Sequence, residues 1–89
     1  MKAVTLDGCS IASKEDLHRQ LAQELGFPNW YGGTLDALHD CLTSLGEEAV
    51  ITLCHTDALT DALGPYAQRV IRVLRDAAEA TPQLQLNLA

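Results

Sequence analysis

The residue types most able to do chemistry in this 89-residue chain are gathered in one stretch, FPNWYGGTLDALHDCL, residues 27–42. It holds the only tryptophan, Trp30, beside Tyr31, and two carboxylates, Asp36 and Asp40, four residues apart. Residues at that spacing share one face of a helix, where two like charges lower the stability of the helix. An exposed aromatic ring beside unpaired carboxylates is typical of a binding hot spot. The stretch is therefore predicted to be a contact surface for another molecule.

The helix predicted over residues 34–45 separates an apolar stripe of leucines from a polar face. At about 100° per residue, the polar face carries Asp36, His39, Asp40 and Thr43. Neither aspartate has a Lys or Arg three or four residues away, so their own helix offers no partner charge. Gly32 and Gly33 precede the helix and allow positive φ angles and a close approach of a partner. Of the two adjacent aromatic residues, Tyr31 is expected to fold inward and Trp30 to stay exposed.

Catalysis and metal binding are the weaker interpretations. His39, Asp40 and Cys41 are consecutive, so on a helix they point in different directions and cannot form a nucleophile–base pair. Cys54 and His55 end a predicted strand, but two adjacent ligands are a weak metal signal. The three cysteines show no CxxC spacing, which argues against a disulfide framework and a four-ligand zinc site. The sequence predicts no enzyme, no metal and no cofactor, and cysteines that are reduced and mostly buried.

The charge distribution favours a basic partner. The formal net charge is −6, and the span between Gln20 and Gln68 holds seven acidic residues but no Lys or Arg. Such a stretch repels nucleic acid and anionic membranes and attracts basic proteins, so direct nucleic-acid binding is not expected. No apolar run approaches the roughly 20 residues that span a bilayer, and the N-terminus lacks the long apolar segment of a signal peptide. The expected location is the cytoplasm.

Strands and helices alternate along the chain. Ser13 is the expected N-cap of the first helix, with Asp16 in a position like that of a capping box, and Gly26 and Gly46 are expected to end the first and second helices. The run AVITLC, residues 49–54, predicts a strand buried on both faces. The predicted elements are a strand at 3–6, helices at 14–25 and 34–45, a strand at 49–54, a short helix or loop at 56–63, a helix at 66–80 and a strand at 84–88.

Strands that are joined through helices imply parallel pairing with right-handed crossovers. The expected fold class is therefore α/β, a three-stranded parallel β-sheet packed against helices, with residues 49–54 as the central strand. The whole chain, residues 1–89, is expected to form a single domain. The residues of the last helix expected to face inward are Val70, Val73, Leu74, Ala77 and Ala78.

The stretch PNWYGGTLDALHDCL, residues 28–42, resembles the central motif of the barstar family, small cytoplasmic inhibitors of barnase-type ribonucleases. The similarity continues through DLHRQLAQELG before the motif and VIRVLRDA after it, so it covers nearly the whole chain. The resemblance implies a three-stranded parallel sheet with helices, in agreement with the alternation of elements. It also implies that the partner is a basic barnase-like ribonuclease or a related toxin protein.

The resemblance implies roles for individual residues. The acid that matches Asp40 enters the ribonuclease active site, among the cationic groups that hold the RNA phosphate, and the acid that matches Asp36 pairs with an enzyme arginine. The aromatic residue that matches Trp30 packs on the catalytic histidine, and Gly32 and Thr34 match positions of close contact. An acidic position of the last helix, here Asp76, adds a pair at the rim. With Leu35, His39 and Thr43 of the predicted helix added to these positions, the expected partner-binding set, called the contact surface below, is Trp30, Gly32, Thr34, Leu35, Asp36, His39, Asp40, Thr43 and Asp76.

Several positions depart from the familiar pattern of the family. Trp30 replaces Tyr, Thr34 replaces Asn, and His39 replaces Trp, so a titratable ring lies beside the two aspartates. Asp76 replaces a longer Glu and lies near two arginines of its own helix, with which it could pair. These departures favour a diverged relative of the barnase-type enzymes as the cognate partner.

The free protein is expected to be a monomer that forms a 1:1 heterodimer with the enzyme. A different basic partner, such as a divergent toxin nuclease or a regulator, remains the alternative, and a small Cys/His metal-binding protein is a more distant one.

Overall fold

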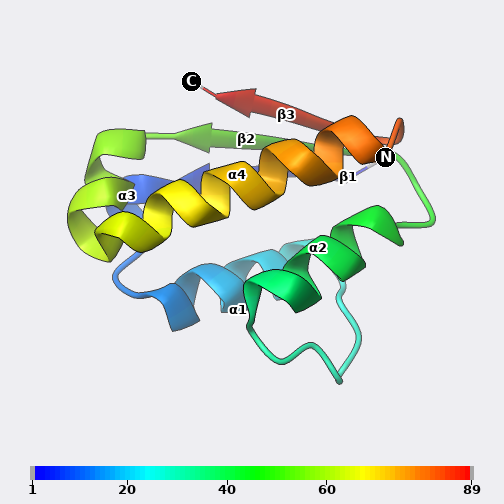
Figure 1. The fold of residues 1–89 in the computed structure, drawn as a ribbon, viewed down its shortest axis with the longest axis horizontal. Helices are drawn as coiled ribbons and strands as arrows, with labels where there is room; N and C mark the ends of the chain where they lie inside the picture. The colour runs from blue at the N-terminus through cyan, green and yellow to red at the C-terminus, as the bar shows by residue number, and fades with distance from the viewer. Residues whose placement is uncertain (1, 89) are drawn as a thin grey trace.

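The computed structural model describes residues 2–88 and confirms the predicted α/β class (Figure 1). The elements are β1 (Lys2–Asp7), a 3-10 turn η1 (Gly8–Ser10), α1 (Lys14–Leu25), α2 (Leu35–Thr43), β2 (Ala49–Cys54), α3 (Thr56–Leu63), α4 (Pro65–Ala80) and β3 (Leu84–Leu88). The segment for which the sequence left a helix or a loop open is thus the helix α3. Within the described residues, no helix combines the length and the apolar character needed to cross a bilayer.

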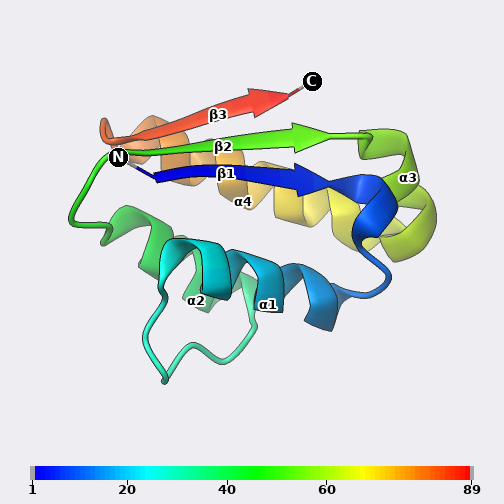
Figure 2. The ribbon, with the colours of Figure 1, turned by 180° about the vertical axis from the view of Figure 1, so that it is seen from behind.

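The three strands form one parallel sheet in the order β1-β2-β3, and β2 is central as predicted. Helices α1, α2 and α4 all lie on the same face of this sheet (Figures 1 and 2). Two crossovers of the same hand that add strands in one direction must pass over the same face, and the preferred hand is the right-handed one. The connections therefore leave the other face of the sheet without a helical cover.

The prediction that residues 49–54 are buried on both faces is wrong. Burial alternates along β2: Ala49, Ile51 and Leu53 are buried beneath the helices, whereas the residues between them and Cys54 are half-buried. A continuous apolar run is typical of parallel strands with helices on both sides, but here only one side is covered. The apolar pattern identified the strand correctly but not the number of layers around it.

The caps of α1 agree with the sequence prediction. The Ser13 hydroxyl accepts the backbone N–H of Asp16 at 3.1 Å, and the Asp16 carboxylate accepts the N–H of Ala12 at 3.2 Å. Gly26 ends the helix in the left-handed region, with φ of 67°. Leu17, Leu21 and Leu25 are buried, as the four-residue spacing predicted. This helix is therefore fixed at both ends before it meets the loop that leads to α2.

Helix α2 is shorter than predicted, because it ends at Thr43, two residues before Leu45, the predicted last residue. The backbone N–H of Ser44 is shared between the carbonyl oxygens of Asp40 and Cys41, at 3.1 and 3.3 Å, which tightens the last turn. The Thr43 hydroxyl donates to the carbonyl oxygen of His39 at 2.9 Å. Leu45 still packs against the core from outside the helix.

The core lies between the sheet and the helices. The largest fully buried side chains are Val4, Leu6, Leu17, Leu21, Leu38, Leu42, Ile51, Leu53, Leu59, Val70 and Leu74. Val73 and Ala78, which were expected to face inward, are only half-buried at the edge of the packed face of α4. All three cysteines are free, but the prediction that they are mostly buried is wrong: Cys41 is buried, Cys54 is half-buried and Cys9 is exposed.

Candidate functional site

The two adjacent aromatic residues of the loop that joins α1 to α2 differ in burial. Trp30 is 67% exposed. Tyr31 packs partly against the core, with its ring centroid 4.9 Å from that of Phe27. The expectation that Tyr31 folds inward while Trp30 faces solvent is therefore confirmed. The exposed indole ring is free to contact a partner without any loss of core packing.

The polar face of α2 presents its carboxylates to solvent. Asp36 and Asp40 are both exposed, while Leu38, Cys41 and Leu42 on the other side of the helix are buried. Within residues 2–88, ion pairs join Lys2 to Glu47 and Arg19 to Asp16, and His55 is hydrogen-bonded to Asp7. None of these contacts involves Asp36 or Asp40. The two negative charges are therefore neutralised neither by burial nor by a cation of the described chain.

The remaining residues of the contact surface surround these charges. Thr34 is the N-cap of α2, where its hydroxyl accepts the N–H of Ala37 at 3.1 Å. His39, Thr43 and Leu35 are half-buried. Asp76 is exposed on α4, which packs directly against α2, and the described residues give it no ion pair with its neighbouring arginines. The fold thus packs the helix that carries Asp76 against the helix that carries Asp36 and Asp40.

The two glycines of the loop, Gly32 and Gly33, differ in backbone conformation. Gly33 adopts a positive φ of 73° and passes over the side chain of His18, so it is the glycine with the unusual backbone. A Cβ atom at Gly32 would meet no atom of this chain within 4 Å. The sequence assigned the same freedom to both residues, and the structure assigns it to Gly33. If Gly32 has to be small, the reason lies in a partner and not in the fold.

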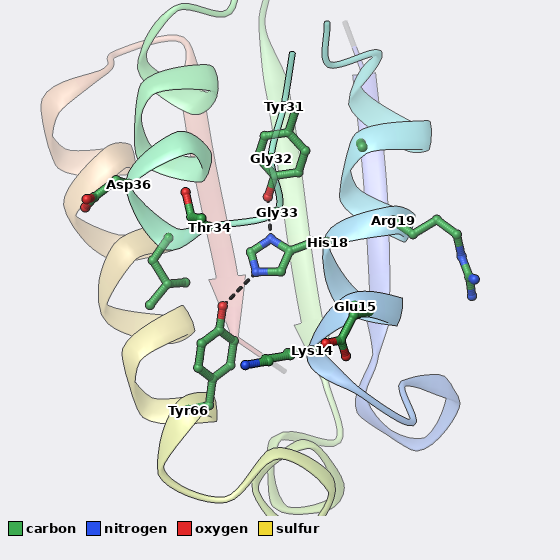
Figure 3. A pocket seen from close by; sticks show the side chains of 12 residues that line it. Lys14, Glu15, His18, Arg19, Tyr31, Gly32, Gly33, Thr34, Asp36 and Tyr66 are labelled. Atoms are coloured by element: carbon green, nitrogen blue, oxygen red, sulfur yellow. Dashed lines mark hydrogen bonds between the residues drawn. The ribbon is translucent and has the colours of Figure 1, made fainter. Parts of the chain in front are cut away.

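An open groove of about 730 Å³ lies between α1, the loop and the start of α2 (Figure 3). From the contact surface it includes Gly32, Thr34, Leu35 and Asp36, and it also includes Lys14, Glu15, His18, Arg19, Ala22, Tyr31, Gly33 and Tyr66. Asp36 and Arg19 point outward from its rim, and Lys14 approaches the ring of Tyr66 (Figure 3). Sequence reasoning did not find the α1 side of this groove, nor Tyr66.

At the floor of the groove, His18 bridges two tyrosines. Its Nδ1 is hydrogen-bonded to the hydroxyl of Tyr31, and its Nε2 lies 2.7 Å from the hydroxyl of Tyr66 (Figure 3). A neutral imidazole has one donor and one acceptor nitrogen, so one tyrosine donates and the other accepts. His18 is only 4% exposed. This histidine–tyrosine cluster ties α1 and α4 to the loop that carries Trp30.

Burial sets the ionisation of this cluster. Desolvation lowers the pKa of His18 below its ordinary value of 6.5 and raises the pKa of Tyr66 above its ordinary value of 10.0. Desolvation also raises the pKa of Tyr31. The sequence did contain a signal for His18, because it lies three and seven residues before Leu21 and Leu25, on the apolar face of α1. A histidine on an apolar face needs buried hydrogen-bond partners, and the fold supplies them.

We expect the stability of the protein to fall as the pH is lowered from about 7 to about 5. The unfolded chain binds a proton on His18 near pH 6.5, whereas the folded chain binds it only at a lower pH. The contribution of His18 is therefore complete above its unfolded pKa and is lost as the pH falls through the two values, with a slope of at most about 1.4 kcal/mol per pH unit. Urea unfolding at a series of pH values measures the slope.

The matched control for this titration is His39→Ala, which removes a histidine that lies outside the cluster. It should leave the pH slope in place, whereas His18→Gln, which keeps a polar side chain that does not titrate in this range, should flatten it. An equal slope in the protein and in His18→Gln would contradict the assignment.

Among the described residues, one group of three His, Cys, Asp or Glu side chains is close enough to hold a metal ion, and it lies outside the contact surface. The contact surface itself offers exposed carboxylates, an aromatic ring and backbone groups. That combination is suited to binding a cationic protein surface.

Comparisons with known proteins agree with this geometry. The family model for barstar, the barnase inhibitor, matches residues 1–88. The putative ribonuclease inhibitor YrdF of Bacillus subtilis (strain 168) is 36% identical over 80 residues, which cover 89% of this chain and 88% of that protein. The chain therefore belongs to the barstar family, whose members are inhibitors and not enzymes.

Proposed function

We propose that this protein inhibits a basic ribonuclease of the barnase type by covering its active site with the contact surface, one inhibitor to one enzyme. The observation that carries the proposal is the pair of exposed carboxylates, Asp36 and Asp40, which have no partner cation within the described residues and lie on the helix that follows the loop of Trp30. Membership of the barstar family, and the printed name of the relative, support a ribonuclease as the partner.

The chemistry of the partner explains why carboxylates inhibit it. A ribonuclease that cleaves through a cyclic phosphate gathers Arg, Lys and His around that phosphate, which makes its cleft a focused positive field. Asp40 takes the place of the phosphate without offering a bond that can be cleaved, Asp36 pairs with an arginine, and Trp30 packs on the catalytic histidine. Since the buried side of α2 fixes the helix, little freedom is lost when the carboxylates bind.

The charge of the whole molecule supports fast recognition. The formal net charge is −6, and opposed fields raise the rate of encounter, while buried charge pairs mainly slow dissociation. Fast capture matters because an active ribonuclease would degrade cellular RNA before a slow inhibitor reached it. For the same reason we place the protein in the cytoplasm, where that RNA is. His39, Trp30 and Asp76 depart from the familiar pattern, so the cognate enzyme is a diverged one.

Trp30→Ala is expected to weaken inhibition by about thirtyfold or more, because truncation of an aromatic hot spot costs about 2 kcal/mol or more. The side chain is 67% exposed, so the free energy of unfolding should change by no more than about 0.5 kcal/mol. Residual RNA cleavage by a panel of basic barnase-type ribonucleases, titrated with the protein and the variant, measures the effect.

The control for Trp30 is Leu88→Ala. Leu88 is the other large hydrophobic side chain that is exposed in the described chain, at 44%, and it lies on β3, outside the contact surface. The Leu88→Ala variant should therefore inhibit the ribonuclease as strongly as the unaltered protein does. Failure of the unaltered protein to inhibit any member of the panel, at concentrations far above that of the enzyme, would count against the proposed function.

A further inference from the structure

A second cluster of reactive side chains lies at the carboxyl ends of β1 and β2. Asp7 and Cys54 are paired in register as the last residues of the two strands, and His55 follows Cys54. His55 Nδ1 lies 2.8 Å from Asp7 Oδ1. One ligand atom from each of the three residues lies within 4.8 Å of the other two. Because Asp7 and His55 are 48 residues apart in sequence, the grouping is visible only after the strands have paired.

The backbone around this cluster is unusual in ways that fix its geometry. His55 has a positive φ of 55°, and it is the only non-glycine residue with a positive φ in the described chain. Such a conformation costs on the order of 1–3 kcal/mol and persists only where the surroundings impose it. The facing residue is Gly8, where any Cβ atom would overlap the carbonyl oxygen of His55. The turn after β1 and the start of α3 are thus packed so that the imidazole of His55 is held beside Asp7.

We propose that Asp7, Cys54 and His55 bind a divalent ion of the zinc class. Zn²⁺ takes thiolate sulfur at about 2.3 Å and imidazole nitrogen or carboxylate oxygen at about 2.0–2.2 Å, and this mixture of ligands suits it better than Mg²⁺ or Ca²⁺. These bond lengths place the ligand atoms of a tetrahedral site about 3.5 Å apart. The three ligand atoms lie within 4.8 Å of one another, so small rotations of the partly exposed side chains bring them to that separation. The His55 side chain is 59% exposed, which leaves the fourth position open to solvent.

Binding of the metal ion would release a proton and break two hydrogen bonds of the cluster. The Cys54 thiol donates a weak hydrogen bond to the carbonyl oxygen of Leu6 at 3.6 Å. The metal takes the thiolate, so this bond is lost and one proton is released to solvent. The proton that His55 Nδ1 donates to the Asp7 carboxylate moves to Nε2 through solvent. Nδ1 and the carboxylate then both bind the ion, and their hydrogen bond is lost. Affinity for the ion therefore rises with pH.

The surroundings favour a cation. Asp57 and Asp61 of α3 line the same shallow depression as Cys54 and His55. Cys9 lines it too, two residues beyond Asp7. The lining residues of the depression lie on α3 and on the segments that join it to the sheet, and Figure 2 shows α3 well away from the loop between α1 and α2. No residue of the contact surface belongs to it, so metal binding and ribonuclease binding can be tested separately.

Titration with Co²⁺ alone, in the presence of a reductant that is not a thiol, tests the site on the whole chain. One equivalent should bind and give the thiolate-to-cobalt absorption band, and Zn²⁺ should displace it. Cys54→Ser should abolish the band, and His55→Asn should weaken binding at least tenfold, about the scale seen when a metal site loses supporting groups. Asn tolerates a positive φ, so His55→Asn tests the ligand without imposing a new backbone.

The control variants separate this site from surface chelation. Asp61→Asn removes a nearby acid that is not a ligand, so it should weaken Co²⁺ binding only through the loss of a screened charge and less than His55→Asn does. Cys9→Ser removes the neighbouring exposed thiol and should bind Co²⁺ within about twofold of the unaltered protein. Zn²⁺ should also raise the Tm of the unaltered protein but not that of Cys54→Ser, because an ion that binds the folded state stabilises it. Absence of the thiolate band, or its loss in Cys9→Ser and retention in Cys54→Ser, would overturn the proposal whether or not the protein inhibits a ribonuclease.

Discussion

Asp40→Ala is expected to weaken binding to the cognate ribonuclease more than any other single change on α2, by about 2–5 kcal/mol. This range corresponds to about thirtyfold to several thousandfold in Kd. The proposed reason is that Asp40 stands for the RNA phosphate, so its removal leaves several enzyme cations facing one another in a dry interface. Asp40 is exposed in the free protein, so the free energy of unfolding should not fall. Removal of one of two like charges four residues apart should even raise it by a few tenths of a kcal/mol.

Titration calorimetry at two ionic strengths measures this effect. Salt screens the charges that are exposed in the two free proteins, so the difference in affinity between the unaltered protein and Asp40→Ala should shrink at the higher ionic strength. Asp61→Ala is the matched control, because it removes the same charge from an exposed position on α3. If both variants lost affinity equally, the effect would come from net charge, and Asp40 would not be the anchor.

His18→Ala is expected to lower the free energy of unfolding by about 2–5 kcal/mol, the range for large-to-small changes in a core. The side chain is 4% exposed and bonds the hydroxyls of Tyr31 and Tyr66. Its loss leaves a cavity beneath the loop and takes a partner from both hydroxyls, which adds to the cost. Because the total stability of a small domain is only about 5–15 kcal/mol, this change removes a large part of it.

Chemical denaturation of His18→Ala, with His39→Ala as the matched histidine control, gives the measurement. His39 is half-buried on the polar face of α2, so its truncation should cost much less. Tyr66→Phe removes only one of the two hydrogen bonds and should fall between the two, at about 1–3 kcal/mol. If His18→Ala lowered the free energy of unfolding no more than His39→Ala does, the histidine–tyrosine cluster would not anchor the loop.

The expected effects of Asp40→Ala and His18→Ala distinguish residues that bind the partner from residues that hold the loop in place. Asp40 is expected to act on the partner and hardly at all on folding, whereas His18 acts on folding and, through Tyr31, on the loop that presents Trp30. A variant such as His18→Gln should therefore bind more weakly, and increasingly so as a higher temperature loosens the loop, even though His18 itself does not reach the proposed interface. Measurements of affinity and of stability on the same variants distinguish these roles.

Features that depend on neighbouring residues in the sequence were predictable. The Leu17, Leu21 and Leu25 stripe, the Ser13 cap and the Gly26 stop fix α1 through contacts within a few residues, and they are found as expected. The alternation of strands and helices gave the parallel three-stranded sheet. The exposure of Asp36 and Asp40 followed from the helical period, and that of Trp30 from the end of α1 at Gly26, which leaves Trp30 in a surface loop. Local periodicity and capping are physical properties of the segment itself, so they can be inferred without the rest of the fold.

Features that depend on distant segments were not predictable. Which face of the sheet is covered follows from the hand of the crossovers, so the half-exposed side of β2 could not be inferred from its apolar run. The sequence determined which side chains are offered on each helix, whereas only the tertiary structure decided that His18 meets Tyr66 and that Asp7 meets His55. In each of those pairs, strand pairing and helix packing bring together groups 48 residues apart, and no local pattern encodes that proximity.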